Sequence, residues 1–188
     1  MKKIPTLFKK VYEDGEYKGI SKEVDERFKW VLEGDGEATV KYDGSCCAVI
    51  NGKFYKRYDA KRGKKAPIGA IPCCEPDLET GHHPHWVLVD WNDPSDKWFV
   101  SAYRTSVAMG DELIDGTYEA IGKHFCSNPY GHEGDFLIRH GRDVVSVDRT
   151  VEGIKKYLQD NNIEGLVFWK DGEPQCKIRK KDFGFKWK

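Results

Sequence analysis

Short segments in which apolar and polar residues alternate follow one another along most of the chain. Such alternation is typical of β-strands with one buried face. Two-residue turns that favour hairpins separate several of these segments, among them Asn51-Gly52 and Asp171-Gly172. We predict strands at residues 37–42, 45–50, 53–58, 85–91, 97–103, 116–121, 135–140, 164–170 and 175–180.

Apolar residues at helical spacing follow the possible N-caps Asp148 and Thr150, and predict an amphipathic helix that begins near residue 151. The chain therefore combines many hairpins with few helices. This combination predicts an α+β fold of antiparallel sheets rather than a parallel α/β sheet.

The first 36 residues mix charge with one helical-looking stretch, and their role is uncertain. Val24, Phe28 and Val31 recur at helical spacing, with Ser21 or Asp25 as a possible cap. We predict a helix in this stretch.

The composition is that of a globular protein, with 39% hydrophobic and 13% aromatic residues in a chain of 188. This length fits a single domain spanning residues 1–188 and is short for two. No apolar run approaches the length of a membrane span, so we expect no membrane partner and a cytoplasmic location. The sequence leaves the oligomeric state open.

Positive charge is concentrated in two stretches, although the 31 basic and 31 acidic residues of the chain balance. Residues 53–65 contain one acid, Asp59, and residues 177–188 also contain one, Asp182. Such stretches form phosphate-binding faces or solvated strand edges. Residues 60–84 are rich in proline, glycine and basic residues, and predict a long surface loop.

Cysteine and histidine gather near the end of that loop. Cys73 and Cys74 are followed by His82, His83 and His85, which are ligand types that bind zinc. Their spacing matches no recognised zinc pattern, so we rank a loop that holds no metal ahead of a zinc site.

Five elements that carry chemistry occur in order along the chain. The first is the Lys-x-Asp-Gly turn Lys41-Tyr42-Asp43-Gly44, and the second is Arg57 at a hairpin end. The others are Glu119 in a strand, Glu164 before Gly165, and the closing basic strand Lys177-Ile178-Arg179. Each alone is more often a turn or a solvated charge than a site. In this order they resemble the covalent nucleotidyltransferase superfamily of DNA ligases, RNA ligases and RNA capping enzymes.

From about Glu37 to the end, the chain looks like the compact single-domain 5′–3′ RNA ligases of vertebrates and some viruses. Residues 41–47, 57–59, 81–87, 128–131 and 138–141 carry this narrower resemblance. It implies a nucleotidyltransferase (adenylation) fold with a few flanking helices and no C-terminal oligonucleotide-binding barrel. It also implies an ATP-dependent RNA ligase that seals RNA with 5′-phosphate and 3′-hydroxyl ends in RNA repair. ATP would be the substrate, and Mg²⁺ or Mn²⁺ the cofactor.

The resemblance assigns Lys41 as the nucleophile that attacks the α-phosphorus of ATP and carries AMP. It places Asp43 beside the ribose and the metal, and Glu164 at the metal. Lys177 and Arg179 would hold the α-phosphate, and cations beside the nucleophile favour its neutral amine. The family usually has lysine where Arg179 stands, and the two side chains bind phosphate with different geometry.

Further nucleotide contacts follow from the same resemblance. Arg57 would contact phosphate, with Lys56 and Arg62 as alternatives. The adenine would stack on Phe136 or His140, between which the sequence does not choose.

Glu119 would hold the ribose. The family motif often reads Asp-Gly-Glu, whereas Asp115-Gly116 stand three residues before Glu119. The assignment therefore stays open, with Glu112 as the poorer alternative.

RNA binding would fall on the basic loop. We expect it to contact the RNA backbone through Lys61, Arg62, Lys64 and Lys65. Four tryptophans lie on predicted strands, and we interpret them as core or rim residues rather than base-stacking platforms: Trp86, Trp91, Trp98 and Trp169.

Two alternative functions remain beside the RNA ligase. Within the superfamily, the chain could be a capping-type guanylyltransferase or a DNA nick ligase. In another class, it could be a catalytically silent RNA-binding module. The presence of four motif residues speaks against the silent module: Lys41, Arg57, Glu164 and Lys177.

Overall fold

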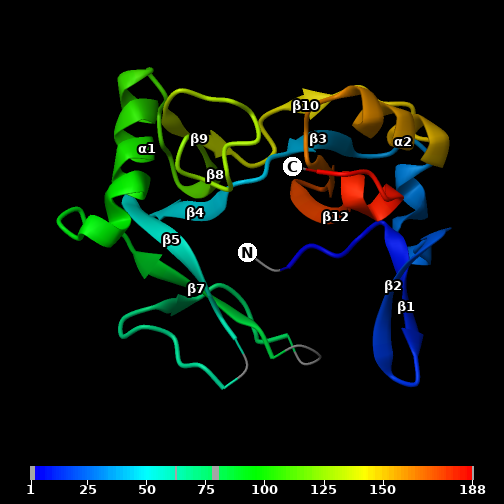
Figure 1. Ribbon diagram of the computed structural model, residues 1–188, viewed down its shortest axis with the longest axis horizontal. Coiled ribbons are helices and arrows are strands. Elements are labelled where there is room, and N and C mark those ends of the chain that lie inside the picture. The colour runs from blue at the N-terminus through cyan, green and yellow to red at the C-terminus, as the bar shows by residue number, and fades with distance from the viewer. Residues whose placement is uncertain (1–2, 62, 78–80, 188) are drawn as a thin grey trace. The chain divides into compact units, whose positions relative to one another are not determined.

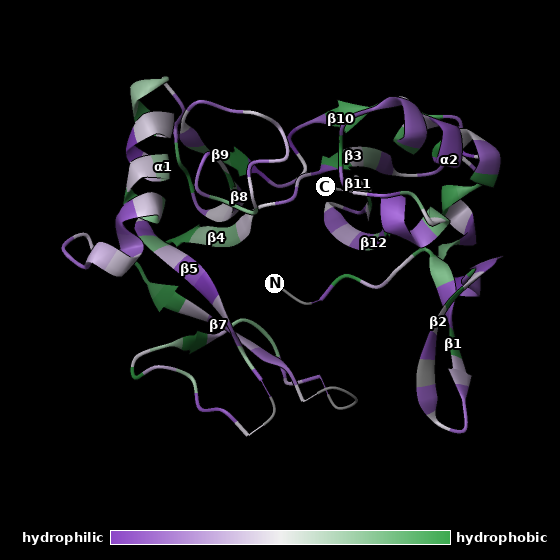
Figure 2. Cartoon of the chain, in the orientation of Figure 1, coloured by the Kyte–Doolittle hydropathy of each residue, from purple (hydrophilic) through white to green (hydrophobic). Residues whose placement is uncertain are grey.

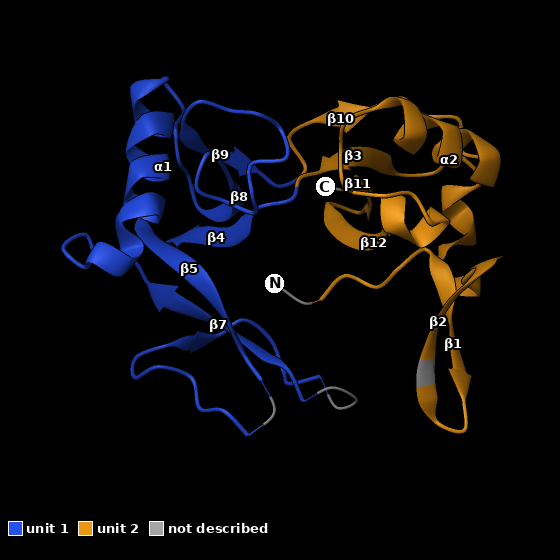
Figure 3. Cartoon of the chain, in the orientation of Figure 1, with its two compact units in different colours: residues 1–2, 43–140 blue, residues 3–42, 141–188 orange. Residues whose placement is uncertain are grey.

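The structure is a computed structural model that describes residues 3–61, 63–77 and 81–187. These residues form two compact units (Figure 3). Unit 1 comprises residues 43–140, and unit 2 comprises residues 3–42 and 141–187. Each unit is described by itself, and the expectation of a single domain stays a prediction.

The described part of unit 1 contains one six-stranded antiparallel sheet with the order β6-β7-β5-β4-β8-β9 (Figure 1). In chain order its strands are β4 (Ser45–Ile50), β5 (Lys53–Ala60), β6 (Ile71–Pro72), β7 (His83–Leu88), β8 (Gly116–Gly122) and β9 (Asp135–Arg139). Asn51 and Gly52 both have positive φ and close the hairpin between β4 and β5, as the sequence predicts. Among the described residues of the predicted surface loop after β5, the two-residue β6 is the one strand before β7 begins.

The predicted strand at residues 97–103 is wrong. A 3-10 turn (Pro94–Asp96) leads into helix α1 (Lys97–Ala108). Val100 and Ala102 of α1 join the unit 1 core, which also contains Phe54 of β5 and Leu137 of β9. The aromatic and β-branched residues of this segment favour a strand, but packing against the sheet decides the outcome.

The described part of unit 2 contains a four-stranded antiparallel sheet with the order β10-β3-β11-β12 and a separate two-stranded ribbon, β1-β2. Its elements are β1 (Phe8–Glu13), β2 (Glu16–Val24), a 3-10 helix (Glu26–Val31), β3 (Glu37–Lys41), β10 (Val144–Val145), α2 (Val151–Asp160), β11 (Gly165–Lys170), β12 (Glu173–Arg179) and a second 3-10 helix (Lys180–Phe183). The Thr150 hydroxyl accepts a hydrogen bond from the Gly153 amide and caps α2, which confirms the predicted helix. Ile154 and Leu158 of α2 are fully buried in the core with Phe168.

The predicted helix in the first 36 residues is correct only in part. Asp25 caps the short 3-10 helix as expected, whereas Ser21 lies within β2. The β1-β2 hairpin was not predicted, because its residues are mostly hydrophilic and lack clear alternation (Figure 2). Leu7 and Phe8 are buried in the unit 2 core, so this segment is an integral part of the unit.

The predicted α+β class with antiparallel sheets is confirmed. Apart from 97–103, each predicted strand matches an observed one, with boundary shifts of up to three residues. No helix of the described chain is long and apolar enough to cross a membrane.

Candidate active site

The predicted nucleophile Lys41 and the predicted metal ligand Glu164 meet in unit 2. Lys41 ends β3, and its register partner on β11 is Gly165, the residue after Glu164. The pairing brings the Lys41 Nζ to 2.5 Å from a Glu164 carboxylate oxygen. The two side chains keep 23% and 14% of their exposure, so the ion pair is largely shielded but reachable from solvent.

A glycine is required after Glu164. A Cβ at position 165 would lie 2.2 Å from the carbonyl oxygen of Ile178 and 2.9 Å from the Cα of Arg179. Gly165 therefore allows β12 to approach β11 closely. It also fixes Glu164 at the end of the strand that pairs with β3.

Lys177 lies on β12, where Val167 of β11 is its register partner. Burial, together with the positive charges of Lys41 and Arg179, lowers the pKa of the Lys177 ammonium to about 8. Gly165 of β11 is the register partner of both Lys41 and Arg179, so unit 2 places these cations on the two strands that flank β11. Such a cluster suits an anion of high charge density.

The Arg179 side chain is less available than that of Lys177 for binding an anion. Its guanidinium donates to both carboxylate oxygens of Asp182, at 3.2 and 2.9 Å, and the Arg179 amide also donates to Asp182. Arg179 thus has an acidic partner in its own turn. Phosphate would have to share or displace that partner.

In unit 1, the Asp43-Gly44 turn is held by three contacts. The Asp43 amide donates to the Tyr130 hydroxyl at 2.7 Å, and the Gly44 amide donates to Glu119 at 3.1 Å. The Cys126 thiol donates to the Gly44 carbonyl at 3.1 Å. A Cβ at position 44 would lie 2.2 Å from the Ala120 carbonyl oxygen, so only glycine fits this turn.

The segment that supplies two of these contacts has an uncommon backbone. Cys126, Ser127 and Asn128 have φ values of 47°, 63° and 50°. Three consecutive non-glycine residues in the left-handed region store strain, which concentrates at functional sites. The sequence singled out residues 128–131 by resemblance, but it gave no role to Tyr130 or Cys126.

Glu119 and His140 form a pair in unit 1. Glu119 Oε2 lies 2.9 Å from His140 Nε2, and His140 Nδ1 lies 2.9 Å from the Thr117 hydroxyl. Both ring nitrogens are engaged, so the plane of the imidazole is fixed. Glu112, the alternative to Glu119, is exposed. The Asp115 carboxylate accepts hydrogen bonds from the backbone amides of Asn51 and Gly52 in the β4-β5 hairpin.

Cys46 joins this pair. Its thiol and ligand atoms of Glu119 and His140 lie within 4.8 Å of one another, which is close enough for the three to hold a soft metal ion. Burial and the negative charge of Glu119 raise the pKa of the Cys46 thiol to about 12, although Arg57 opposes the shift. A metal ion would have to compete with the Arg57 guanidinium, which shares a hydrogen bond with Cys46.

Of the candidates for the phosphate-binding arginine, Arg57 lies on β5 with its Nε 2.9 Å from Asp59. Lys56 forms an ion pair with the buried Asp96, which makes it a structural residue. Arg62 lies outside the described residues. Phe136, the other candidate for adenine stacking, packs edge-on against His132 at 4.8 Å between ring centroids.

The remaining predicted residues lie in the loop after β5. Lys61, Lys64 and Lys65 are exposed. Among the described residues, the loop's cysteines and histidines form no group of three with converging ligand atoms.

Known proteins provide one point of comparison. No protein-family profile matches the chain. The chain is 30% identical to RNA ligase 1 of Danio rerio in an alignment that covers 58% of this chain and 43% of the relative. It thus spans less than half of that protein's length. This similarity supports a relationship to an RNA ligase.

Proposed function

We propose that the protein is an ATP-dependent RNA ligase in which Lys41 carries AMP. The observation that carries the proposal is the Lys41–Glu164 pair, flanked on the neighbouring strand by a lysine of lowered pKa. The similarity to RNA ligase 1 of Danio rerio points in the same direction.

The first step uses groups of unit 2. The Lys41 ammonium loses a proton to solvent, and its Nζ attacks the α-phosphorus of ATP. A phosphorus–nitrogen bond forms, the bond to the pyrophosphate oxygen breaks, and pyrophosphate leaves. Lys177 then stabilises the negative charge that develops on the α-phosphate, with a smaller contribution from Arg179 because of Asp182.

Glu164 has two functions in this proposal. It orients the Lys41 ammonium before reaction, and its carboxylate becomes available once the amine is neutral. A carboxylate beside a phosphate-binding site fits Mg²⁺ or Mn²⁺, which binds proteins through one or two carboxylates plus substrate oxygens. Such an ion would neutralise charge on the phosphates of ATP. By resemblance, Asp43 is the second carboxylate.

Residues of unit 1 recognise the nucleoside and its phosphate. Glu119, oriented by Gly44 and His140, accepts a hydrogen bond from the ribose. Arg57 binds phosphate, and Phe136 or His140 stacks on the adenine. The Tyr130 contact to the Asp43 amide keeps the turn after Lys41 in one conformation.

The AMP then activates the RNA. A 5′-phosphate oxygen of the RNA attacks the lysine-bound phosphorus and releases the Lys41 amine. The 3′-hydroxyl of the second RNA end next attacks the activated 5′-phosphate and releases AMP, which leaves a phosphodiester bond.

Sealing tests the whole proposal. The protein would be incubated with ATP or GTP, Mg²⁺ and a pair of oligonucleotide ends, either RNA or DNA, with a 5′-phosphate and a 3′-hydroxyl. We expect ATP-dependent sealing of RNA and poor sealing of DNA. GTP-specific adduct formation would indicate a capping-type enzyme, better sealing of nicked DNA would indicate a DNA ligase, and RNA binding without any reaction would indicate a silent module.

A further inference from the structure

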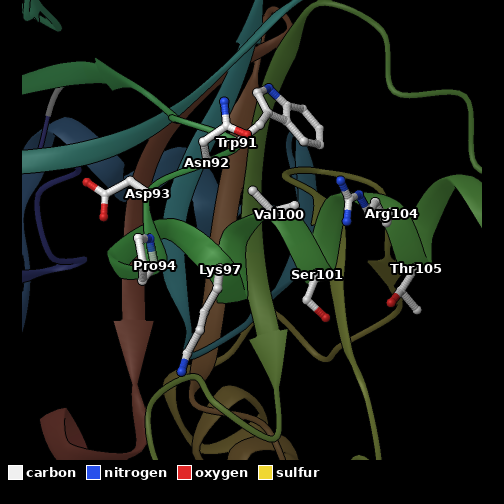
Figure 4. A pocket seen from close by; sticks show the side chains of 9 residues that line it. All are labelled: Trp91, Asn92, Asp93, Pro94, Lys97, Val100, Ser101, Arg104 and Thr105. Atoms are coloured by element: carbon white, nitrogen blue, oxygen red, sulfur yellow. The ribbon is translucent and has the colours of Figure 1, made fainter.

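A pocket of about 380 Å³ lies in unit 1, apart from the residues assigned to the nucleotide. The turn after β7 forms one wall, with Trp91 and Asn92, and one face of α1 forms the other (Figure 4). Its volume is at the lower end of the range for small-molecule sites and is large enough for one nucleotide unit.

An exposed aromatic ring borders the pocket. Trp91 is 45% exposed, although it is one of the largest apolar side chains. Tyr103 packs edge-on against it, with 5.2 Å between ring centroids and an interplanar angle of 86°. The guanidinium of Arg104 lies 5.7 Å from the Trp91 ring centroid. An indole held in this way can stack on a nucleobase, and the cation beside it can bind the adjoining phosphate.

The pocket also carries unpaired positive charge. Lys97 and Arg104 lie two helical turns apart on α1, and within the described residues neither forms an ion pair with an acid. Lys56, by contrast, is neutralised by Asp96. The acid that lines the pocket is Asp93, whose carboxylate accepts the Ser95 amide.

Polar groups complete the lining. Ser101 and Thr105 present hydroxyls from α1, and Asn92 presents an amide from the turn (Figure 4). They can bind ribose hydroxyls or base edges without selecting one base. Flat aromatic surface, two cations and adaptable hydrogen bonding together suit a nucleotide of single-stranded nucleic acid.

A second aromatic group lies beside Lys97, which itself lines the pocket. Lys97 also lies over the ring of Trp98, with its Nζ 4.6 Å from the centroid. Trp98 is 37% exposed and stacks on His124, with 3.3 Å between centroids and an angle of 5°. A cation of α1 therefore lies beside each of two partly exposed indoles, Arg104 beside Trp91 and Lys97 beside Trp98. Two such pairs favour a nucleic-acid strand over a free nucleotide.

We propose that this pocket is a subsite for one nucleotide of a single-stranded RNA, with its base on Trp91 and its phosphate between Lys97 and Arg104. The choice of RNA as the ligand rests on the proposed function. The predicted placement of Trp91 and Trp98 on strands is wrong, because Trp91 follows β7 in a turn and Trp98 lies on α1.

Binding of a fluorescein-labelled twelve-nucleotide single-stranded RNA without a 5′-phosphate, measured by anisotropy, tests the proposal. Trp91→Ala should weaken binding about fivefold or more, because a base loses its stacking partner. Arg104→Gln should weaken binding and lower the salt dependence by about one unit of slope. Asp93→Asn should tighten binding, because it removes a negative charge from the pocket and an asparagine can still cap Ser95.

Tyr12→Ala is the matched control, because Tyr12 has the same 45% exposure and lies beside the cation of Lys10. Ser101→Glu provides a second test in case Trp91→Ala misfolds. It keeps Trp91 but adds a negative charge to the pocket, so it should also weaken RNA binding. If Trp91→Ala, Arg104→Gln and Ser101→Glu all bind like Tyr12→Ala, or if the unmodified protein does not bind this RNA, the subsite is wrong.

Lysine–AMP formation separates this inference from the proposed function. The pocket variants should form the adduct like the unmodified protein, since the pocket contains no residue assigned to adenylation. If no protein forms the adduct but RNA binding still depends on Trp91, the subsite stands and the ligase proposal fails. If the adduct forms but no pocket variant changes RNA binding, the ligase proposal stands and the subsite fails.

Discussion

The Nζ of Lys41 lies 2.5 Å from a carboxylate oxygen of Glu164, although 123 residues separate the two in sequence. The pairing of β3 with β11 creates this contact, because Gly165 is the register partner of Lys41. The Lys41 amine thus has a carboxylate beside it.

Glu164→Gln should abolish most lysine–AMP formation. The amide keeps the size of the side chain but neither holds the ammonium by charge nor binds a divalent cation, so we expect a loss of about a hundredfold or more. Asp35→Asn is the matched control, because it breaks an exposed ion pair with Lys170 in the same unit. Single-turnover adduct formation at several Mg²⁺ concentrations measures the effect, and near-normal rates in Glu164→Gln would contradict the role of Glu164.

Most strands and several hairpins were predictable from the sequence, whereas the contacts between distant strands were not. Hairpin signals such as Asn51-Gly52 and Asp171-Gly172 are local, and both turns occur. Contacts such as Glu119 with His140 and Cys46 depend on the register of three strands, which is set by packing rather than by any one segment.

Helix α1 lies where the local sequence predicts a strand. Ala102 and Ser106 are fully buried against the sheet, yet neither is a large apolar residue that marks a helical face. The aromatic and β-branched residues between them favour a strand locally. The Asp93-Pro94 pair, which begins the helical segment, resembles an ordinary turn when it is read alone.

The pH dependence of stability should show the buried charge of Lys177. Its pKa is about 8 in the folded protein, against the ordinary value of 10.5. Between these values the unfolded chain holds a proton that the folded chain has lost, so the free energy of unfolding rises with pH in this window. Relative to Lys177→Met, the unmodified protein should therefore gain about 2 kcal/mol between pH 7 and pH 10.

Chemical denaturation of both proteins at each pH measures this gain. Buried thiols such as Cys46 and Cys176 have raised pKa values and act in the opposite direction, but they are common to both proteins and cancel in the difference. Lys170→Met is the control, because the ion pair with Asp35 raises the pKa of Lys170. The difference in unfolding free energy between the unmodified protein and Lys170→Met should therefore change with pH in the opposite direction. A flat difference for Lys177 would show that its ammonium is well solvated.

Gly165→Ala should destabilise the protein by about 2 kcal/mol or more, because the new Cβ would overlap backbone atoms of Ile178 and Arg179 that cannot move without separating the strands. Gly134→Ala is the matched control, since a Cβ there meets nothing within 4 Å. Urea unfolding compares the two variants. Equal stability would mean that β11 and β12 are not so closely paired.

Neutralising the basic loop should separate the steps of ligation. A variant with Lys61, Arg62, Lys64 and Lys65 changed to glutamine should form lysine–AMP at nearly the normal rate. It should seal RNA poorly and show a flatter salt dependence of RNA binding, because fewer counterions are released. An equal loss of adduct formation and sealing would indicate that Arg62, rather than Arg57, binds the phosphate of ATP.

The position of AMP on the chain tests the central claim most directly. The protein would be incubated with ATP and Mg²⁺, digested at neutral pH, and analysed by mass spectrometry for peptides that have gained one AMP. We expect the modification on Lys41 alone, and Lys41→Arg should keep its fold but gain no AMP. AMP on another residue, or an adduct that persists in Lys41→Arg, would contradict the assignment of Lys41 as the nucleophile.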